Sequence, residues 1–551
     1  MKTRLIRALE EALASCFRKG TLTSGQLPAI QLEVPNNPEH GDFATNLAMT
    51  LARAEKKAPR QVAEAILAEL DSDLCRKVDI AGPGFINFSL KPQLWFGLLD
   101  EIYRQGACYG TSQVGKGLRV QVEFVSANPT GPLHIGHGRG AAVGDALASL
   151  LLATGFDVQR EYYINDAGNQ VATLGRSIWL RLRELGGEVI DFPEDGYRGD
   201  YVKEIARELR EEKGDLAEMP EDEVLALCSD FGIARMLRWI GNDLEVFGIR
   251  FDNWYSERSL YQRDMVNQEL AKLTQKNLTY TDEGALWFRT TAYGDDKDRV
   301  LIKSDGSTTY FASDVAYHME KFDRGFERVI DVWGADHHGY IPRMKAVLTG
   351  LGHAPEDLHV VLIQMVNLLR QGQPVAMGKR SGEFVTLREV VDEVGRDACR
   401  FFFLMRRSDS PLDFDLDLAK QQSNDNPVFY VQYAHARVCS INRNASEAGV
   451  ERPAPGAAAL DRLDDGDELA LVKLLARYPE MLEAAALVYE PHRVVYYLQE
   501  LAMQFHSYYN RSRVLDSDPA VSGARLYLVN AVRQVLQNAL TLLGVAAPER
   551  M

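Results

Sequence analysis

Two kinds of hydrophobic pattern divide this chain. In the region from about residue 119 to residue 370, short apolar runs such as VQVEFV, RVIDVW and HVVLIQMVNLL alternate with segments of helical period. From about residue 416 onward, apolar side chains recur every three or four positions, and strand-like runs are almost absent. The first pattern predicts a parallel α/β sheet, because strands connected by helices run in one direction. The second pattern predicts a separate helical bundle.

Breaks in these patterns predict three domains. We expect a small α+β domain over residues 1–110, where a Gly-Pro-Gly turn feeds a strand. An α/β domain follows over residues 111–415, and a Glu-rich helical insertion at about 185–260 splits its sheet in the sequence. Residues 416–551 complete the chain as an all-α bundle. Helical spacing also predicts the buried stripe of the insertion, which comprises Ile233, Met236, Leu237, Ile240, Leu244 and Phe247.

The composition is that of an ordinary globular protein, with 46% hydrophobic and 25% charged residues among 551. Its 62 Lys and Arg residues against 78 Asp and Glu residues give a net charge of −16. This balance excludes a strongly basic, non-specific nucleic-acid binder, but it leaves room for a local basic face.

The cysteines and the termini indicate where the protein works. The six cysteines form no CxxC pair, and no histidine stands at metal spacing, so we expect neither disulfides nor a metal centre, and a reducing cytoplasm. The opening MKTRLIRALEEALASCF carries charges throughout and reads as an amphipathic helix rather than a signal peptide. No stretch is apolar for long enough to span a bilayer, and no apolar stripe demands a dimer, so we expect a monomer without a membrane partner.

The sharpest chemical motif is the segment His134-Ile135-Gly136-His137, which stands where a strand ends and a helix begins. Free backbone N–H groups at a helix start attract phosphate, Gly136 leaves room for close approach, and two imidazoles can donate hydrogen bonds to a phosphate chain. The motif therefore predicts a nucleotide site. The alternative is a turn with two solvent-facing histidines; a dinucleotide fingerprint is excluded, because the glycines do not keep GxGxxG spacing.

A second motif lies about 240 residues further on, in AMGKRSG at residues 376–382. Alone, a Lys and an Arg between glycines indicate only a solvated turn. Together with the histidine motif, this loop predicts a cationic partner that neutralises charge on a departing pyrophosphate.

These two motifs resemble the double signature of class I aminoacyl-tRNA synthetases, which is HIGH followed by a KMSKS-type loop. The context ANPTGPLHIGHGRG is similar to bacterial arginyl-tRNA synthetases, as are PGFINFSL, YYINDAGNQ and FHSYYNRSRV elsewhere in the chain. The resemblance implies a Rossmann-like catalytic domain between an N-terminal tRNA-elbow domain and a C-terminal anticodon-binding helical domain. It also implies an arginine-tRNA ligase that uses ATP with Mg²⁺, L-arginine and tRNA(Arg), and whose first step typically needs bound tRNA.

The resemblance further assigns the substrate sites. Three residues would stabilise charge in the transition state; they are His134, His137 and Lys379. The ATP site would comprise His134, Gly136, His137, Gly138, Asp336, Met365, Val366 and Lys379. The arginine site would comprise Glu123, Ser126, Asn128, His137, Tyr310, Asp314 and His337. The chemistry agrees, because a planar, permanently charged guanidinium calls for a carboxylate with flanking acceptors.

The resemblance places tRNA contacts at both ends of the chain. In the N-terminal domain, Phe85 and Asn87 match positions that touch the D-loop in relatives, whereas Gly82 replaces a base-reading asparagine. In the bundle, basic and aromatic residues suit phosphates and unpaired bases. The tRNA-binding set there is Tyr509, Arg511 and Arg513, with Arg437, Arg443 and Asn510 in the same group.

The chain departs from the family pattern in the second motif. Ala376 occupies the place of the first lysine, and Gly131 stands where some relatives carry a compensating lysine. Another cation would then be needed, for which Lys303, Arg343 and Lys345 are candidates.

Several alternatives stay open at this stage. Asp314 alone reads as a helix N-cap, and the adjacent His337 and His338 invite a metal site, although no third ligand has a recognisable spacing. Two rival functions remain: another HxGH nucleotidyltransferase that needs no tRNA, and a non-catalytic tRNA-binding paralogue.

Overall fold

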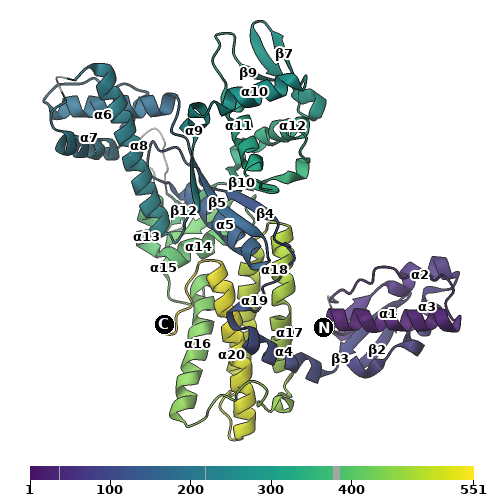
Figure 1. Ribbon diagram of the computed structural model, residues 1–551. Coiled ribbons are helices and arrows are strands. Elements are labelled where there is room, and N and C mark those ends of the chain that lie inside the picture. Colours follow the sequence, from purple (N-terminus) through teal and green to yellow (C-terminus); the bar gives the residue numbers. More distant parts are fainter. Residues whose placement is uncertain (36, 217–218, 376–384) are drawn as a thin grey trace. The chain divides into compact units, whose positions relative to one another are not determined.

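The computed structural model describes residues 1–35, 37–216, 219–375 and 385–551 (Figure 1). The chain divides into two compact units. The first unit comprises Met1–Tyr109, Arg437–Arg477 and Met503–Val535, and the second comprises Gly110–Ala436, Tyr478–Ala502 and Leu536–Met551. Three long helices run from one unit into the other; they are α16 (Pro427–Glu447), α19 (His492–Arg511) and α20 (Pro519–Leu542).

A five-stranded parallel sheet forms the centre of the second unit. Its order is β11-β10-β4-β5-β6. The strands are β4 (Arg119–Glu123), β5 (Asp157–Ile164), β6 (Asn253–Ser256), β10 (Arg328–Gly334) and β11 (Leu358–Ile363). Strands β4 and β5 precede the helical insertion in the sequence, and β10 and β11 follow it. The predicted α/β fold with a sheet split in the sequence is therefore confirmed.

Helices cover both faces of this sheet. On one face, α5 (Ile135–Ala153) packs against β4, β5 and β10. The approach is close, because a Cβ atom on Gly144 would lie 2.3 Å from Phe124 Cγ. On the other face lie α11 (Tyr310–Asp323) and α12 (Ile341–Leu351). Since side chains alternate along a strand, Glu123, the residue before Phe124, points toward α11.

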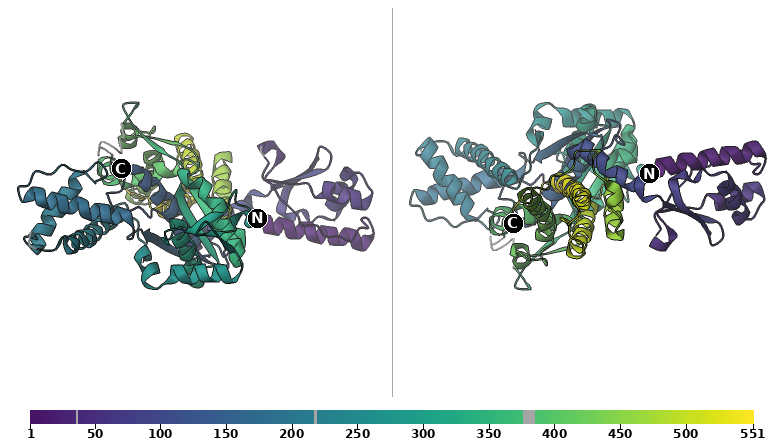
Figure 2. Two further views of the ribbon diagram at one scale, coloured as in Figure 1. Left: turned by 90° about the horizontal axis from the view of Figure 1, so that it is seen from above. Right: turned by 90° about the horizontal axis from the view of Figure 1, so that it is seen from below.

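The helical insertion has its own core. Helices α6 (Asn169–Leu185), α7 (Asp200–Lys213) and α8 (Glu221–Val246) pack against one another (Figures 1 and 2). Their shared cluster includes Ile178, Ile205 and Met236. Of the predicted stripe, Leu237 is only half-buried, whereas the other members are buried; they are Ile233, Met236, Ile240, Leu244 and Phe247. The stripe is thus largely confirmed.

Two strand-like runs do not join the central sheet as the pattern suggested. The run HVVLIQMVNLL breaks at Gln364 and Met365 into β11 and β12 (Val366–Arg370), and β12 belongs to a small sheet with β13 (Gln373–Pro374) and β14 (Leu412–Asp415). The run RVLI forms β9 (Arg299–Ile302), which pairs antiparallel with β8. That third sheet contains β7 (Thr279–Asp282), β8 (Ala285–Phe288) and β9. Apolar runs predict strands, but partner choice depends on distant residues.

The first unit begins with a small antiparallel sheet of order β1-β3-β2. Its strands are β1 (Phe43–Thr45), β2 (Cys75–Ala81) and β3 (Phe85–Leu90), and the predicted Gly-Pro-Gly turn joins β2 to β3. Helix α1 (Lys2–Lys19) packs against α3 (Pro59–Glu69), which contacts the sheet (Figure 2). Helix α4 (Pro92–Gln105) contacts α17 (Gly466–Ala476).

The remaining described helices are α2 (Leu47–Glu55), α9 (Glu257–Gln262), α10 (Met265–Gln275), α13 (Leu387–Val394), α14 (Arg396–Leu404), α15 (Leu416–Lys420) and α18 (Tyr478–Leu487). None of the helices in the described part of the chain combines the length and the apolar composition that crossing a bilayer requires.

Candidate active site

The two histidines of the HIGH segment form the start of α5. His134 is the N-cap, and its Nδ1 accepts a hydrogen bond from the Gly136 N–H at 3.1 Å. His137 Nδ1 accepts from the His134 N–H at 3.3 Å, and the two rings stack with centroids 3.6 Å apart. A neutral imidazole that accepts at Nδ1 carries its proton on Nε2. Both rings can therefore donate from Nε2, and they are structured parts of a helix start rather than side chains of a solvent-facing turn.

The glycines of this helix have different roles. A Cβ on Gly136 would lie 3.0 Å from His134 Cε1, so Gly136 makes room for the cap. Gly138 is buried, and its Cβ would lie 2.6 Å from Leu387 Cδ1 and 3.2 Å from Phe403 Cε2. Close helix packing therefore explains Gly138 without a ligand, although its prediction as an ATP residue is not tested.

The second motif, including Lys379, lies outside the described residues, but both of its flanks are described. On the C-terminal side, Thr386 forms a β-bridge with His134, and the Leu387 N–H donates to the Leu133 carbonyl at 2.8 Å. On the N-terminal side, the Val375 N–H donates to the Leu368 carbonyl in β12. The segment that contains the basic loop therefore returns directly to the HIGH histidine.

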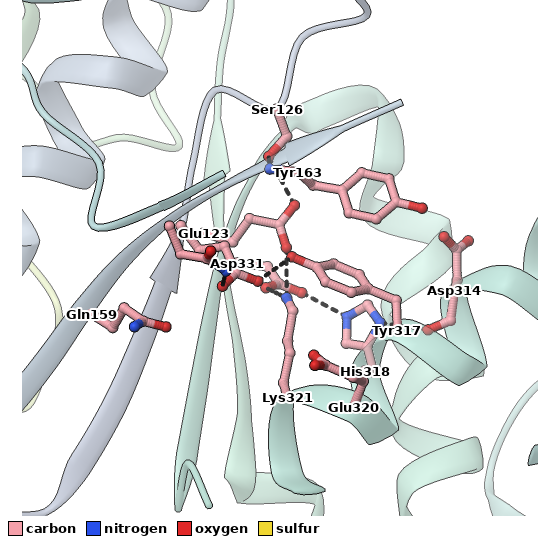
Figure 3. Close-up of polar contacts among 12 residues, drawn as sticks. Glu123, Ser126, Gln159, Tyr163, Asp314, Tyr317, His318, Glu320, Lys321 and Asp331 are labelled. Atoms are coloured by element: carbon pink, nitrogen blue, oxygen red, sulfur yellow. Dashed lines mark hydrogen bonds and ion pairs between the residues drawn. The ribbon is translucent and has the colours of Figure 1, made fainter. Parts of the chain in front are cut away.

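A short turn after β4 carries the predicted amino-acid contacts. Glu123 Oε1 accepts from the Ser126 hydroxyl at 2.9 Å, and Ser126 Oγ accepts from the Tyr163 N–H at 3.1 Å (Figure 3). Val125 and Ser126 both have positive φ, at 69° and 40°, which is costly for residues with a Cβ and is typical of functional turns. Asn128 is exposed in the same turn.

Asp314 lies on the second turn of α11 and accepts a hydrogen bond from the Tyr340 hydroxyl. The N-cap of α11 is Thr309, so the reading of Asp314 as a helix cap is wrong. Burial raises the pKa of Asp314 above its usual range, and the carboxylates of Glu123 and Asp331 add to the rise. A buried carboxylate whose own charge is disfavoured is suited to a cationic ligand.

Sequence reasoning missed a second carboxylate at this position. Glu257, at the start of α9, is only 3% exposed, and among the described residues its Oε2 has no hydrogen-bond partner. Burial and then the negative charges of Asp314 and Asp166 raise the pKa of Glu257 to about 7. Its place directly after the strand β6 was the available signal, because parallel strands end at the ligand edge.

The other predicted substrate residues lie at the surface of this sheet edge. Tyr310, at the start of α11, is 64% exposed. Asp336 and His337 are exposed in the 3₁₀ turn Ala335–Tyr340 after β10, with 3.7 Å between His337 Nε2 and Asp336 Oδ2. No group of three or more His, Cys, Asp or Glu side chains within the described ranges could hold a metal ion. His338 is also exposed.

The predicted adenine contacts flank the break between β11 and β12. The Met365 side chain is exposed, whereas Val366 is buried. Both main-chain groups of Met365 are engaged: its N–H donates to Gln364 Oε1 at 3.1 Å, and its carbonyl accepts from the Leu412 N–H at 3.1 Å. Arg139 of α5 fixes this break, because its guanidinium donates to the Gln364 carbonyl at 2.8 Å.

Two of the three cations considered for the missing lysine can be placed relative to the site. Arg343 stacks over the ring of Tyr340 at 4.4 Å, next to Asp314. The charge of Lys345 acts on His359, the second residue of β11, and thus at the opposite edge of the sheet from the ligand edge. Lys345 is therefore not placed to replace that lysine.

The predicted tRNA contacts all lie in the first unit. On β3, Phe85 is 38% exposed, whereas Asn87 is buried on the central strand of its sheet. On α19, Tyr509 is 38% exposed and stacks with the Arg437 guanidinium at 4.7 Å. Arg511 is exposed and pairs with Asp467 at 3.0 Å, and Arg513 is exposed just after that helix.

Comparison with known proteins now decides the family. Three family models match in order: the arginyl tRNA synthetase N-terminal domain over residues 3–90, the catalytic domain of class I (R) tRNA synthetases over 99–405, and the DALR anticodon-binding domain over 431–551. The chain belongs to the arginyl-tRNA synthetase family. The matched catalytic model makes it a ligase of class I, and the DALR match accounts for the helical region that a tRNA-independent nucleotidyltransferase leaves unexplained.

Individual relatives agree with this family over their whole lengths. The arginine–tRNA ligase of Syntrophotalea carbinolica is 65% identical over 554 residues, covering 100% of both chains. That of Geobacillus kaustophilus is 51% identical and covers 98% of each. The solved arginyl-tRNA synthetase of Thermus thermophilus has a TM-score of 0.76 at 24% identity, covers 99% of this chain and 100% of its own, and thus shares the fold.

Proposed function

We propose that the protein joins L-arginine to tRNA(Arg) in two steps driven by ATP. In the first step, the arginine carboxylate attacks the α-phosphate and pyrophosphate leaves. In the second step, the 2′-hydroxyl of the terminal ribose of the tRNA takes the arginyl group from the adenylate. The observation that carries this proposal is a pair of buried carboxylates, Asp314 and Glu257, at the same sheet edge as the histidine-capped start of α5.

The arginine site has two ends in this proposal. Asp314 and Glu257 would receive the guanidinium, and the unpartnered Oε2 of Glu257 supports this role because a buried carboxylate oxygen requires a donor. Ser126 and Glu123 would receive the α-amino end, with Asn128 near the carboxylate. Tyr310 and His337 would border the pocket. A forked cation between two carboxylates makes charge-assisted hydrogen bonds that a lysine ammonium reproduces poorly.

The histidines would serve ATP. The N–H groups at the start of α5 face a phosphate chain favourably, and the Nε2–H groups of His134 and His137 can donate to the oxygens that gain charge as pyrophosphate leaves. Lys379 would add a positive charge from the loop that returns to Thr386. Gly136, Gly138, Asp336, Met365 and Val366 would complete the ATP site. None of these groups needs to act as a nucleophile.

Mg²⁺ would accompany the ATP. Oxygen donors suit this ion, and it usually keeps several waters and binds through phosphate oxygens together with one or two carboxylates. Asp336 offers an exposed carboxylate at the ligand edge. When bound, the ion would neutralise charge on the triphosphate.

The tRNA would contact the first unit through Phe85 and Asn87 and through Tyr509, Arg511 and Arg513. Since the described chain has six free cysteines, which suits a reducing compartment, we also propose a cytoplasmic monomer. Light scattering should then give the mass of one chain, 61.7 kDa.

Exchange of labelled pyrophosphate into ATP tests the function directly. We expect exchange that depends on arginine and on tRNA(Arg), and arginyl-tRNA when the reaction is run forward. Exchange with another amino acid, or no exchange with both ligands present, would refute the proposal.

A further inference from the structure

Three carboxylates lie side by side under the proposed arginine site. Glu123 on β4 is in register with Asp331 on β10 and with Glu161 on β5. All three strands are parallel neighbours, so these side chains share the sheet face that α11 covers. Three buried negative charges in a row are costly unless cations compensate them.

Lys321 of α11 supplies the central compensation. Its Nζ donates to Glu123 Oε2 at 2.6 Å and to Asp331 Oδ1 at 2.8 Å, and its side chain is fully buried (Figure 3). Burial alone would lower the pKa of Lys321, but Asp331, Glu123 and Glu161 raise it above its usual range. The lysine is therefore a permanent buried cation between two strands.

Neighbouring groups complete the network. Glu161 accepts from the Tyr317 hydroxyl at 2.7 Å and from the Arg324 guanidinium at 2.6 Å and 2.8 Å, so its charge is compensated separately. His318 Nε2 lies 2.9 Å from Asp331 Oδ2. Lys321 thus remains the cation that Glu123 and Asp331 share.

This network reaches both ends of the proposed arginine site. At one end, the Glu123 oxygen that Lys321 does not hold accepts from the Ser126 hydroxyl. At the other end, His318 Nδ1 lies 2.8 Å from the carbonyl oxygen of Asp314. One continuous path of hydrogen bonds therefore connects the turn that would bind the α-amino group with the helix that would bind the guanidinium.

We propose that Lys321 is a positioning residue for arginine: it holds Glu123 ionised and in place, so that Ser126 and the α-amino group meet a fixed negative charge. This inference rests on the proposed function and adds to it a residue that does not touch the substrate. A merely structural ion cluster would instead affect the stability of the fold and leave substrate preference unchanged.

The first test separates arginine from ATP. In pyrophosphate exchange with tRNA(Arg) present, Lys321→Met should raise the KM for arginine about tenfold or more, as expected when a hydrogen bond to a charged group is lost. The KM for ATP should change less than about twofold, since the network makes no contact with the HIGH segment. Arg235→Met is the matched control, because two carboxylates, Glu208 and Glu212, hold that cation in the insertion. It should leave both KM values unchanged.

The second test uses charge balance. In Lys321→Met, Glu123 and Asp331 face each other without a cation, so one of them is expected to take up a proton. Replacing Asp331→Asn as well removes that competition and gives Glu123 an amide donor. The double variant should therefore bind arginine better than Lys321→Met. A simple loss of packing would make the double variant equal or worse.

Specific results would overturn the inference. A folded Lys321→Met with wild-type KM for arginine, an equal rise in both KM values, or no rescue in the double variant would each do so. Where Lys321→Met does not fold, Lys321→Gln, whose amide still donates, should show the same bias toward arginine in a milder form. Failure of the wild type to exchange with arginine and tRNA(Arg) would instead refute the proposed function itself.

Discussion

At the scale of single residues, the carboxylates of the sheet edge differ in how easily they carry charge. Asp331 faces Lys321 and His318, which lower its pKa although burial alone would raise it. Asp314 and Glu257 have no such cation, and burial raises the pKa of each. The difference separates a carboxylate whose charge is already compensated within the protein from a pair that awaits a ligand's charge. Arginine would supply that charge.

This difference predicts a pH dependence of arginine binding. Below a pH of about 7, Glu257 is largely neutral, and a guanidinium gains little from it. As the pH rises toward that value the carboxylate ionises, so the KM for arginine should fall, by up to about tenfold per unit, and level off above it. The measurement is the KM for arginine between pH 6 and pH 8.5. Glu257→Gln should flatten this profile, and a wild-type profile that is already flat would contradict the assignment.

The HIGH histidines should act on the rate rather than on ATP affinity. His137→Ala removes an Nε2–H donor whose value lies in the charge that develops on the phosphates. We expect kcat to fall about 10² to 10³-fold, the usual loss for one such donor, with the KM for ATP changed only a few-fold. The loss of the His134 N–H partner should cost about 1 kcal/mol of stability, which a melting curve would register. Equal changes in kcat and in ATP affinity would indicate ordinary ground-state binding.

At the scale of elements, the sequence predicted strands and helices better than their partners. The alternation of VQVEFV and RVIDVW with helical segments was sufficient for the parallel sheet, because local spacing decides whether a face is buried. It was not sufficient to place β9 and β12 in separate sheets, since strand partners are chosen by residues far away in the chain. The ion network was missed for the same reason: Glu123, Glu161 and Asp331 meet only through register. Their signal was a charge inside each apolar run.

Helix α5 offers a sharp element-scale prediction about two glycines. Replacing a helical glycine by alanine normally stabilises a helix by about 1 kcal/mol. Gly140→Ala should follow this rule, because the nearest atom to its added Cβ would be 4.0 Å away. Gly138→Ala should instead destabilise the protein by about 1 to 3 kcal/mol, because its Cβ would collide with Leu387. Denaturant midpoints of the two variants provide the comparison. Similar midpoints would show that Leu387 gives way easily.

At the scale of the whole molecule, an acidic protein of charge −16 must bind an RNA. Its long-range field opposes the tRNA, so attraction has to come from cations within about a Debye length of the phosphates. The basic residues predicted to contact tRNA gather in the first unit rather than over the whole chain. Some of them are already engaged: Arg511 pairs with Asp467, and Arg437 stacks on Tyr509.

Arg513 provides the whole-molecule test, because it is exposed at the end of α19 within the predicted tRNA surface. If its guanidinium neutralises a phosphate, Arg513→Ala should weaken tRNA(Arg) binding several-fold and lower the slope of log Kd against log salt by about 0.7 to 0.9. The KM for arginine should not change, since the substitution is remote from the carboxylates. Arg7→Ala is the control, because Arg7 is an exposed arginine on α1 that pairs with Glu11. Filter binding at several salt concentrations measures both slopes, and equal slopes for the two variants would remove Arg513 from the interface.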